Sequence, residues 1–327
     1  MLRCGEQEGI IQIAGPVRSM TDGAQWNRWT RAAAAAAMLL AAATGGTSGQ
    51  ALNLDEVLFR ASQAVVRFEF EFGNRMADER YEQRVVASDG QVKRNRRFGS
   101  ELVFFRDARA DTWTSFRNVR EENGEPKGRD WLDGDVDSPN LGDFLRAATR
   151  RDQASTRRYI GDAPWSLHMP LLALTFLHPL NRHRSNFEKA DEVTVDGRPV
   201  WVIRFSEHRR PPFVRVGGGG PSGGGRSGRV TAGDLFASGS FWIDPESGSV
   251  VKSDLVLGGS VSSVQARSHI TVIFRQLAAS ELWVPAEMVE SYDNPLFPDV
   301  DHLEGTATYA NYRPLSLEPA HADESGR

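Results

Sequence analysis

Alternating hydrophobic and polar positions dominate the chain from residue 185 onward. This period of two predicts strands at 185–195, 200–207, 238–243, 250–257, 264–276, 283–292 and 302–312. Turn-forming residues such as Asp196-Gly197 separate them, and consecutive strands joined by short turns must be antiparallel. The pattern therefore predicts one large antiparallel sheet. It lacks the strand–helix alternation of a doubly wound nucleotide-binding fold.

Helical and strand-like segments are mixed before residue 185. Residues 52–66 begin at Asn53, a good N-cap residue, with Glu56 three places on, and continue with apolar residues at helical spacing. Further segments predict strands at 81–88, 101–108 and 112–119 and a helix at 139–151. Together with the sheet, they indicate a mainly β protein with some helix, an α+β fold.

One more predicted helix, at residues 169–177, has no polar face. Its apolar residues are Leu171, Leu172, Leu174, Phe176 and Leu177. A helix that is apolar all round must be buried or must cover something apolar. We therefore expect this segment to lie over the sheet.

Two predicted strands place their apolar residues on one face, away from Arg204, Lys252 and Asp254. The residues of this face are Trp201, Ile203, Phe205, Val251, Leu255 and Leu257. A sheet with one apolar face needs a cover, which the helices at 52–66, 139–151 and 169–177 can supply. The face is either a plain packed core or an apolar cavity beneath a helical lid. In the second case these six residues, with Leu172 and Phe176, are the expected ligand-binding set.

The N-terminus has the parts of a secretory signal peptide. Arg28 and Arg31 precede an apolar, alanine-rich run at 32–43, and small and polar residues follow at 44–50. We expect residues 1–50 to be an N-terminal extension and cleaved signal, with Met20 as an alternative start and cleavage near Ala51. The protein is then periplasmic or secreted. No later stretch approaches the length of a membrane span.

Composition narrows the function further. The 327 residues carry a net charge of −4, which gives no basic field for nucleic acid. The one cysteine, Cys4, excludes a disulfide framework and any cysteine-based metal site. We expect one domain at 51–315, a polar tail at 316–327, and a flexible glycine-rich insertion at 209–229 that has no apolar residues to bury.

Motifs that would carry chemistry are incomplete. Ser222 lies in a glycine-rich pattern similar to that of a nucleophilic serine, but it lacks the flanking strand and helix that hold such a serine. Asp133, Asp135 and Asp137 alternate like the start of a calcium loop, without the glycine and glutamate that complete one. No two histidines have the spacing of a metal-binding helix. We expect no catalytic residue, no metal and no cofactor.

The most specific local pattern is residues 239–251, Gly-Ser-Phe-Trp-Ile-Asp-Pro-Glu-Ser-Gly-Ser-Val-Val. It resembles the strand–turn–strand segment of the periplasmic lipoprotein-carrier superfamily, the LolA/LolB-like fold. The signal, opening helix, long sheet and lid-like helices add to the resemblance, which spans most of 52–315. Residues 116–119, 170–179, 282–288 and 305–313 also resemble an uncharacterised family of secreted bacterial proteins.

The resemblance implies an incomplete β-barrel whose concave apolar face holds acyl chains without cofactor or catalytic residues. The chain departs from the carrier pattern in the long, charged segment at 89–159 and in the glycine-rich insertion. Three hypotheses therefore stand. The protein is a carrier or sensor of a lipid, a lipoprotein acyl chain or another apolar ligand, a secreted hydrolase with an unrecognised site, or a structural module that binds an envelope protein.

Overall fold

The structure is a computed structural model of the chain. It describes residues 11–13, 52–73, 75–87, 89–107, 112–127, 168–216, 233–261, 264–278, 280–293 and 302–314. Several predicted features lie outside these residues. They are the apolar run of the signal peptide, the helix at 139–151, the aspartates at 133–137, the glycines at 217–225 and the polar tail.

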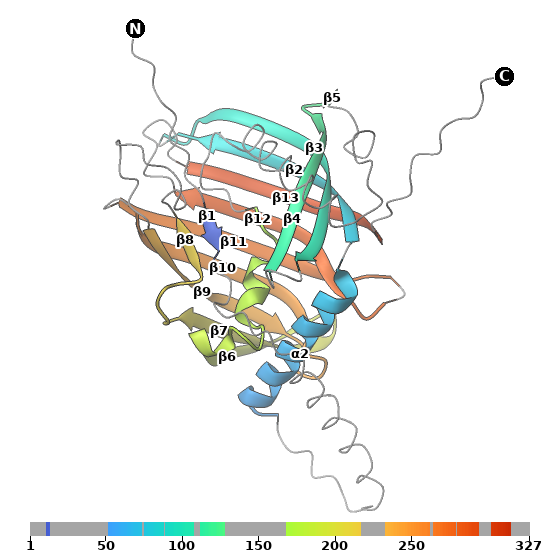
Figure 1. Cartoon of the computed structure of the whole chain (residues 1–327), viewed down its shortest axis with the longest axis vertical. Helices are drawn as coiled ribbons and strands as arrows, with labels where there is room; N and C mark the ends of the chain where they lie inside the picture. The colour runs from blue at the N-terminus through green and yellow to red at the C-terminus, as the bar shows by residue number, and fades with distance from the viewer. Residues whose placement is uncertain are drawn as a thin grey trace, which may run out of the picture.

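The described residues form one large curved antiparallel sheet (Figure 1). Its strands are β1 (Ile11–Ile13), β2 (Arg75–Val86), β3 (Val92–Asp107), β4 (Thr112–Glu122), β5 (Glu125–Pro126), β6 (Ser185–Val195), β7 (Arg198–Glu207), β8 (Val214–Val216), β9 (Gly233–Ile243), β10 (Val250–Val261), β11 (Val264–Gln276), β12 (Trp283–Asp293) and β13 (His302–Pro314). Neighbours follow the order β1-β8-β9-β10-β11-β12-β13-β2-β3-β4-β5, and β7 pairs with both β9 and β6. Within the described part the two ends of this order do not pair, so the barrel is incomplete. The predicted fold class is confirmed.

The two ends of the domain meet in the middle of the sheet. The last strand, β13, pairs antiparallel with β2, so that His302 lies opposite Val86 and Tyr309 opposite Glu79. Strands β6 and β11 have the predicted bounds, whereas β2 begins at Arg75 and β3 at Val92, well before the predicted starts. Charged and polar residues dominate the early parts of both strands, such as Asp78 and Glu79 in β2 and residues 93–97 in β3, which hides the hydrophobic alternation that the prediction needs.

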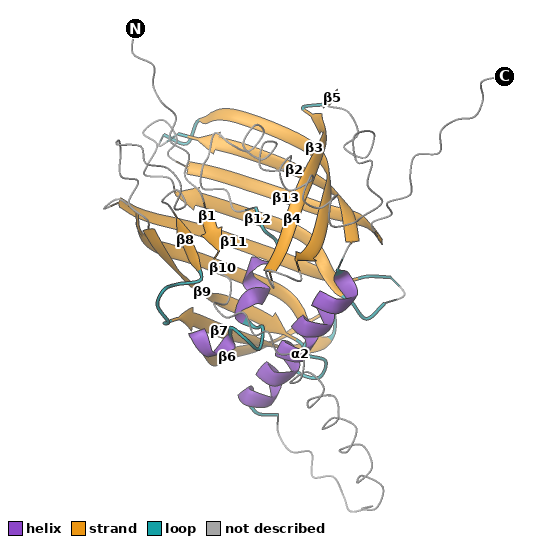
Figure 2. Cartoon of the chain, viewed as in Figure 1, coloured by secondary structure: helices purple, strands orange, loops and turns teal. Residues whose placement is uncertain are grey.

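One α-helix, α2 (Leu54–Phe72), covers one side of the curved sheet (Figure 2). The backbone N–H of Glu56 donates to Asn53 Oδ1 at 2.8 Å, as the predicted N-cap requires. The helix continues past residue 66 because Phe68 and Phe72 extend its buried stripe. No helix in the described ranges combines the length and apolar character of a membrane span.

The apolar segment at 169–177 forms a 3-10 helix, η2 (Leu172–Phe176), rather than an α-helix. The N–H of Leu174 donates to the carbonyl of Leu171 at 3.1 Å, and the N–H of Leu177 to that of Leu174 at 3.0 Å. This spacing of three residues is typical of short connecting helices. The expectation of burial agrees with the structure, since Phe176 and Leu177 are fully buried.

The predicted insertion at 209–229 is partly built into the fold. Phe213 and Val214 are buried, and β8 pairs with β9 on one side and with β1 on the other. The expectation that the insertion has no apolar residues to bury is therefore wrong for its first part. Alternation in Val214-Arg215-Val216 is enough to form a short strand once an edge is available.

Candidate functional site

The inward-facing residues change character along the sheet. On β7, β9 and β10 they are mostly apolar, and we call the apolar set the apolar half: Trp201, Ile203, Phe205, Phe241, Ile243, Leu255 and Leu257. On β2, β4 and β12 they include charged and phenolic side chains, and we call this set the polar half: Glu79, Tyr81, Arg117, Glu290 and Tyr292. All of these residues are buried, and Tyr81 and Tyr292 belong to the same contiguous cluster as the apolar half.

The apolar half is covered by η2, as the sequence pattern predicted. The ring of Phe176 lies 5.2 Å from that of Phe205 and 5.7 Å from that of Phe213. Phe205 in turn stacks on Phe241 with ring centroids 4.8 Å apart. Leu172 joins the same cluster. The structure thus brings the predicted residues of β7 and η2 together, while ligand binding by them stays a prediction.

Val251 is the exception among the predicted residues. The register between β9 and β10 shifts at this point, so that Val250 lies opposite Ile243 and Lys252 opposite Trp242. Val250 belongs to the core cluster, whereas Val251 is buried outside it. A β-bulge, which period-two counting cannot detect, exchanges the two valines. Leu255 and Leu257, beyond the bulge, lie in the cluster as expected.

Helix α2 is bound to two elements beside the apolar half, the end of η2 and the β9–β10 turn. The hydroxyl of Ser62 donates to the carbonyl of Leu177 at 2.8 Å, which ties α2 to the end of η2. The guanidinium of Arg60 donates to the carbonyl of Pro245 at 3.1 Å, in the β9–β10 turn. Gly248 of that turn packs so closely on α2 that a Cβ would lie 2.4 Å from the backbone of Arg60. The β9–β10 turn, which belongs to the segment at 239–251, therefore anchors α2.

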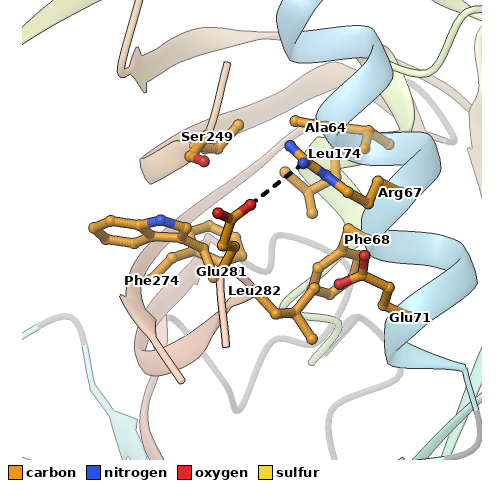
Figure 3. A pocket seen from close by; sticks show the side chains of 12 residues that line it. Ala64, Arg67, Phe68, Glu71, Leu174, Ser249, Phe274, Glu281 and Leu282 are labelled. Carbon is orange, nitrogen blue, oxygen red and sulfur yellow. Dashed lines mark ion pairs between the residues drawn. The ribbon is translucent and has the colours of Figure 1, made fainter. Parts of the chain in front are cut away.

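A small pocket opens between α2, η2 and the β11–β12 turn (Figure 3). Its volume is about 40 Å³, whereas pockets for drug-sized apolar ligands measure several hundred Å³. Its lining residues are Ala64, Val65, Arg67, Phe68, Glu71, Leu174, Ser249, Val250, Phe274, Glu281, Leu282 and Trp283. An ion pair of 3.7 Å between Arg67 and Glu281 crosses it. This pocket, as the structure has it, is therefore too small for such a ligand.

The polar half is centred on His168, which two carboxylates hold from opposite ring nitrogens. Nε2 lies 2.8 Å from Oε1 of Glu79, and Nδ1 lies 2.7 Å from Oε1 of Glu290. A neutral imidazole can donate from one nitrogen alone, so the imidazolium is the form that satisfies both carboxylates. His168 adopts a left-handed backbone conformation with φ of 41°.

Arg117 and two tyrosines complete this cluster. Arg117 donates to both carboxylate oxygens of Glu79, at 2.5 and 3.0 Å, and to the backbone carbonyl of His168 at 3.2 Å. The hydroxyls of Tyr81 and Tyr292 donate to Glu290 at 2.8 and 2.6 Å. Two carboxylates, one guanidinium and one imidazolium give a balanced set of charges in a buried site.

The charges control the pKa values in the cluster. Burial would raise the pKa of Glu79, but Arg117 and His168 lower it to about 2. Burial likewise opposes ionisation of Glu290, while the charge of His168 and its hydrogen bond lower the pKa of that carboxyl below its usual 4.5. Burial and Arg117 lower the pKa of His168, but the two carboxylates outweigh them and raise it above 6.5.

Gly305 on β13 provides the space for this cluster. A Cβ there would lie 2.6 Å from the hydroxyl of Tyr81 and 2.7 Å from Oε1 of Glu290. A side chain at this position would therefore push the Tyr81 hydroxyl or the Glu290 carboxylate out of its place. The glycine, which lies opposite Glu290 in the sheet, is thus part of the site through the space that it leaves.

His168 is not placed to act as a general base that activates a nucleophile. Both ring nitrogens of His168 are taken by carboxylates, which leaves none to accept a proton from a serine. Within the described ranges, no three histidine, cysteine or acidic residues are grouped to hold a metal ion. The cluster can hold charge and orient the segment that carries His168.

Sequence reasoning missed the polar half. The predicted start of β2 at residue 81 excluded Glu79, and His168 stands just before the apolar segment with no pattern around it. One signal was available. In the alternation Met288, Glu290 and Tyr292, a carboxylate occupies an inward position where an apolar residue is expected, which indicates a buried charge that needs a partner.

Comparisons with known proteins give remote structural similarities. A domain of an outer membrane lipoprotein-sorting protein from Vibrio parahaemolyticus is 9% identical with a TM-score of 0.36, covering 80% of this chain and 93% of that one. A DUF1329 family protein from Desulfovibrio piger is 10% identical, with a TM-score of 0.34 and coverages of 79% and 92%. A LolA superfamily protein from Nitrosomonas europaea is 10% identical, with a TM-score of 0.25 and coverages of 77% and 92%.

The last of these belongs to the superfamily that residues 239–251 resemble. No protein-family model matches the sequence. The search of curated proteins finds no match either. At such identities and TM-scores, the similarities carry no argument about a ligand or partner. Any such argument rests on the residues of this chain.

Proposed function

We propose that the protein is an exported, non-catalytic carrier or sensor that holds an apolar chain against the apolar half. The observation that carries this proposal is the cover of that half. An unclosed sheet presents one continuous apolar cluster, and within the described residues α2 and the five residues of η2 lie on it. The short segment η2 pairs with none of the described strands, so its displacement breaks no strand pairing of the sheet.

The pocket beside α2 is the proposed point of access. Its polar closure is the ion pair of Arg67 and Glu281, whose side chains are 51% and 87% exposed. Exposed pairs of this kind contribute about 0–1 kcal/mol, so opening there costs little. Behind the pair lie Val250 and Phe274 of the core cluster.

An alkyl chain can replace the contacts that the cover loses. Each buried methylene contributes roughly 0.8 kcal/mol, so a long acyl chain gains on the order of 10 kcal/mol on entering the core. This gain is large enough to offset displacement of η2 from Phe205. Lipids and lipoprotein acyl chains are therefore the ligand class we propose.

Export is the second part of the proposal. The basic residues Arg28 and Arg31 and the apolar run after them support a cleaved signal, with a mature start near Ala51. N-terminal sequencing of the exported protein tests this, and a start before Ala32 contradicts it. Mass spectrometry of lipids that co-purify with the exported form gives the identity of the chain.

A tryptophan substitution in the pocket tests ligand binding. Ala64 lines the pocket, and Ala64→Trp should fill it, weakening the affinity for a fluorescent fatty acid by about tenfold or more. Gln63→Trp is the matched control, because it adds the same ring to the exposed side of the same helix. Equal affinities of the two variants would contradict the access point, and a wild type that binds no probe would contradict the carrier function.

A further inference from the structure

Glu79 and Glu290 differ in how their charges are balanced. Glu79 has a permanent partner, because Arg117 binds it through two nitrogens. For Glu290, the cation within ion-pair distance in the described part of the chain is His168. Removal of His168 would leave two carboxylates and one guanidinium, a net charge of −1 in a buried site.

His168 belongs to the cover rather than to the sheet. Three residues separate it from Leu172, the first residue of η2. Its backbone is bound to the polar half as well, with the N–H donating to Tyr292 at 3.4 Å and the carbonyl accepting from Arg117 at 3.2 Å. A chain that displaces η2 far enough also breaks these two backbone hydrogen bonds and pulls His168 away from both carboxylates.

A buried carboxylate that loses its cation is costly by several kcal/mol. The ligand-bound state must therefore supply a new cation to Glu290, or solvent must enter the core. A ligand that carries its own cation meets this need directly, since Tyr81 and Tyr292 already orient the carboxylate from its other sides.

We propose that the polar half is a subsite for a protonated nitrogen head group, which replaces the imidazolium of His168 when an amphiphile occupies the apolar half. This inference rests on the proposed carrier function. The ligand class is an alkyl chain with an ammonium or guanidinium group that has at least two N–H donors. Two donors are required because the site offers one acceptor on Glu79 and one on Glu290, at 2.8 and 2.7 Å from the group now present.

Two neighbouring groups favour such a head group. The ring of Tyr81 lies against His168 with centroids 3.9 Å apart, in a position to attract a cation. Ser100 on β3 lies directly opposite Glu79, and its hydroxyl is buried without a partner among the described residues. A ligand with more than two donors or acceptors would satisfy that hydroxyl.

Calorimetric titration of the wild-type protein with three dodecyl amphiphiles, below their micelle concentrations, tests the subsite. Dodecylammonium should bind at least about tenfold more tightly than dodecyltrimethylammonium, which has no N–H donor, and than dodecanoate, which two carboxylates repel. Equal affinities for all three would overturn the subsite and leave the carrier function standing. Binding of none would overturn both.

Glu290→Gln identifies the residue responsible. The variant keeps the shape of the side chain and removes the charge, so the preference for dodecylammonium should fall to about threefold or less. Glu287→Gln is the control, because Glu287 lies on the outer face of the same strand in an exposed pair with Arg275, and its preference should not change. A preference that persists in Glu290→Gln, with an unchanged circular dichroism spectrum, would overturn the assignment. If that variant does not fold, the wild-type comparison decides.

Discussion

The apolar and polar halves are equally buried on one sheet, but they depend on different physics. In the apolar half, contacts such as that of Phe176 with Phe205 have no fixed direction, and another apolar group can replace them. In the polar half, His168 and Arg117 donate hydrogen bonds to specific acceptors, the carboxylates of Glu79 and Glu290. Loss of one partner there leaves a buried charge. Another apolar group can therefore replace the contacts of the apolar half, whereas a group that enters the polar half must supply the same charge and hydrogen bonds.

The largest expected effect is the loss of Arg117. Arg117→Met removes the permanent partner of Glu79 and should lower the free energy of unfolding by about 3–5 kcal/mol, as measured by urea denaturation. Adding Glu79→Gln should recover much of this loss, because the remaining charges of Glu290 and His168 then balance.

Arg275→Met is the matched control for that variant. Arg275 pairs with Glu287 at 2.6 Å on the outer face, where both side chains are largely exposed. Its loss should change the free energy of unfolding by no more than about 0.5 kcal/mol. A similar cost for the two arginines would remove the distinction between the polar half and an ordinary surface pair.

The polar half should make the free energy of unfolding highest over a plateau of pH, with a decline on either side. His168 has a raised pKa, so its contribution is complete below pH 6.5 and is lost as pH rises through the folded-state value. Glu79 and Glu290 have lowered pKa values, so theirs is complete above pH 4.5 and is lost as pH falls toward about 2 for Glu79. A tenfold change in a group's proton affinity on folding corresponds to about 1.4 kcal/mol of stability.

Thermal midpoints between pH 3 and pH 9 would show this plateau. The alkaline decline should disappear in His168→Gln, which cannot titrate. The other groups that face His168 do not produce it, since Arg117 stays charged and the pKa of Tyr81 is raised well above 10. An alkaline decline that is identical in the variant would contradict an imidazolium in the polar half.

A smaller effect is expected in the apolar half. Phe176→Leu removes the ring that lies over Phe205 and should cost about 1–2 kcal/mol, because the remaining core relaxes around the gap. The affinity for a fluorescent fatty acid should stay equal or rise, since the change enlarges the space beneath η2. A large loss of affinity at unchanged stability would instead give Phe176 a specific role in holding the ligand.

The smallest effect is expected outside both halves. Phe70 lies on the outer side of α2 with 88% of its surface exposed, so Phe70→Ser should shift the free energy of unfolding by no more than about 0.5 kcal/mol. Denaturation in urea measures it. A clearly larger cost would show that this side of α2 is covered in solution.

Prediction from sequence succeeded where the hydrophobic period is regular. The strands β6 and β11, the cap of α2 at Asn53 and the apolar face of β7 follow directly from alternation and capping. It failed at the bulge that exchanges Val250 for Val251, and in the insertion, where Phe213 is buried. Both failures are non-local, because they depend on which strand lies beside the residue in question.

The sequence by itself determined the antiparallel sheet and the apolar cover over it, because hydrophobic periodicity and turn residues act between near neighbours. Only the tertiary structure decided the polar half. Glu79, His168 and Glu290 lie on three segments far apart in the chain, and β13 brings two of those segments together by pairing with β2 and β12. Their charges are tolerated in the core because His168 lies 2.7–2.8 Å from each carboxylate, and a local sequence pattern contains no information about such distances between remote segments.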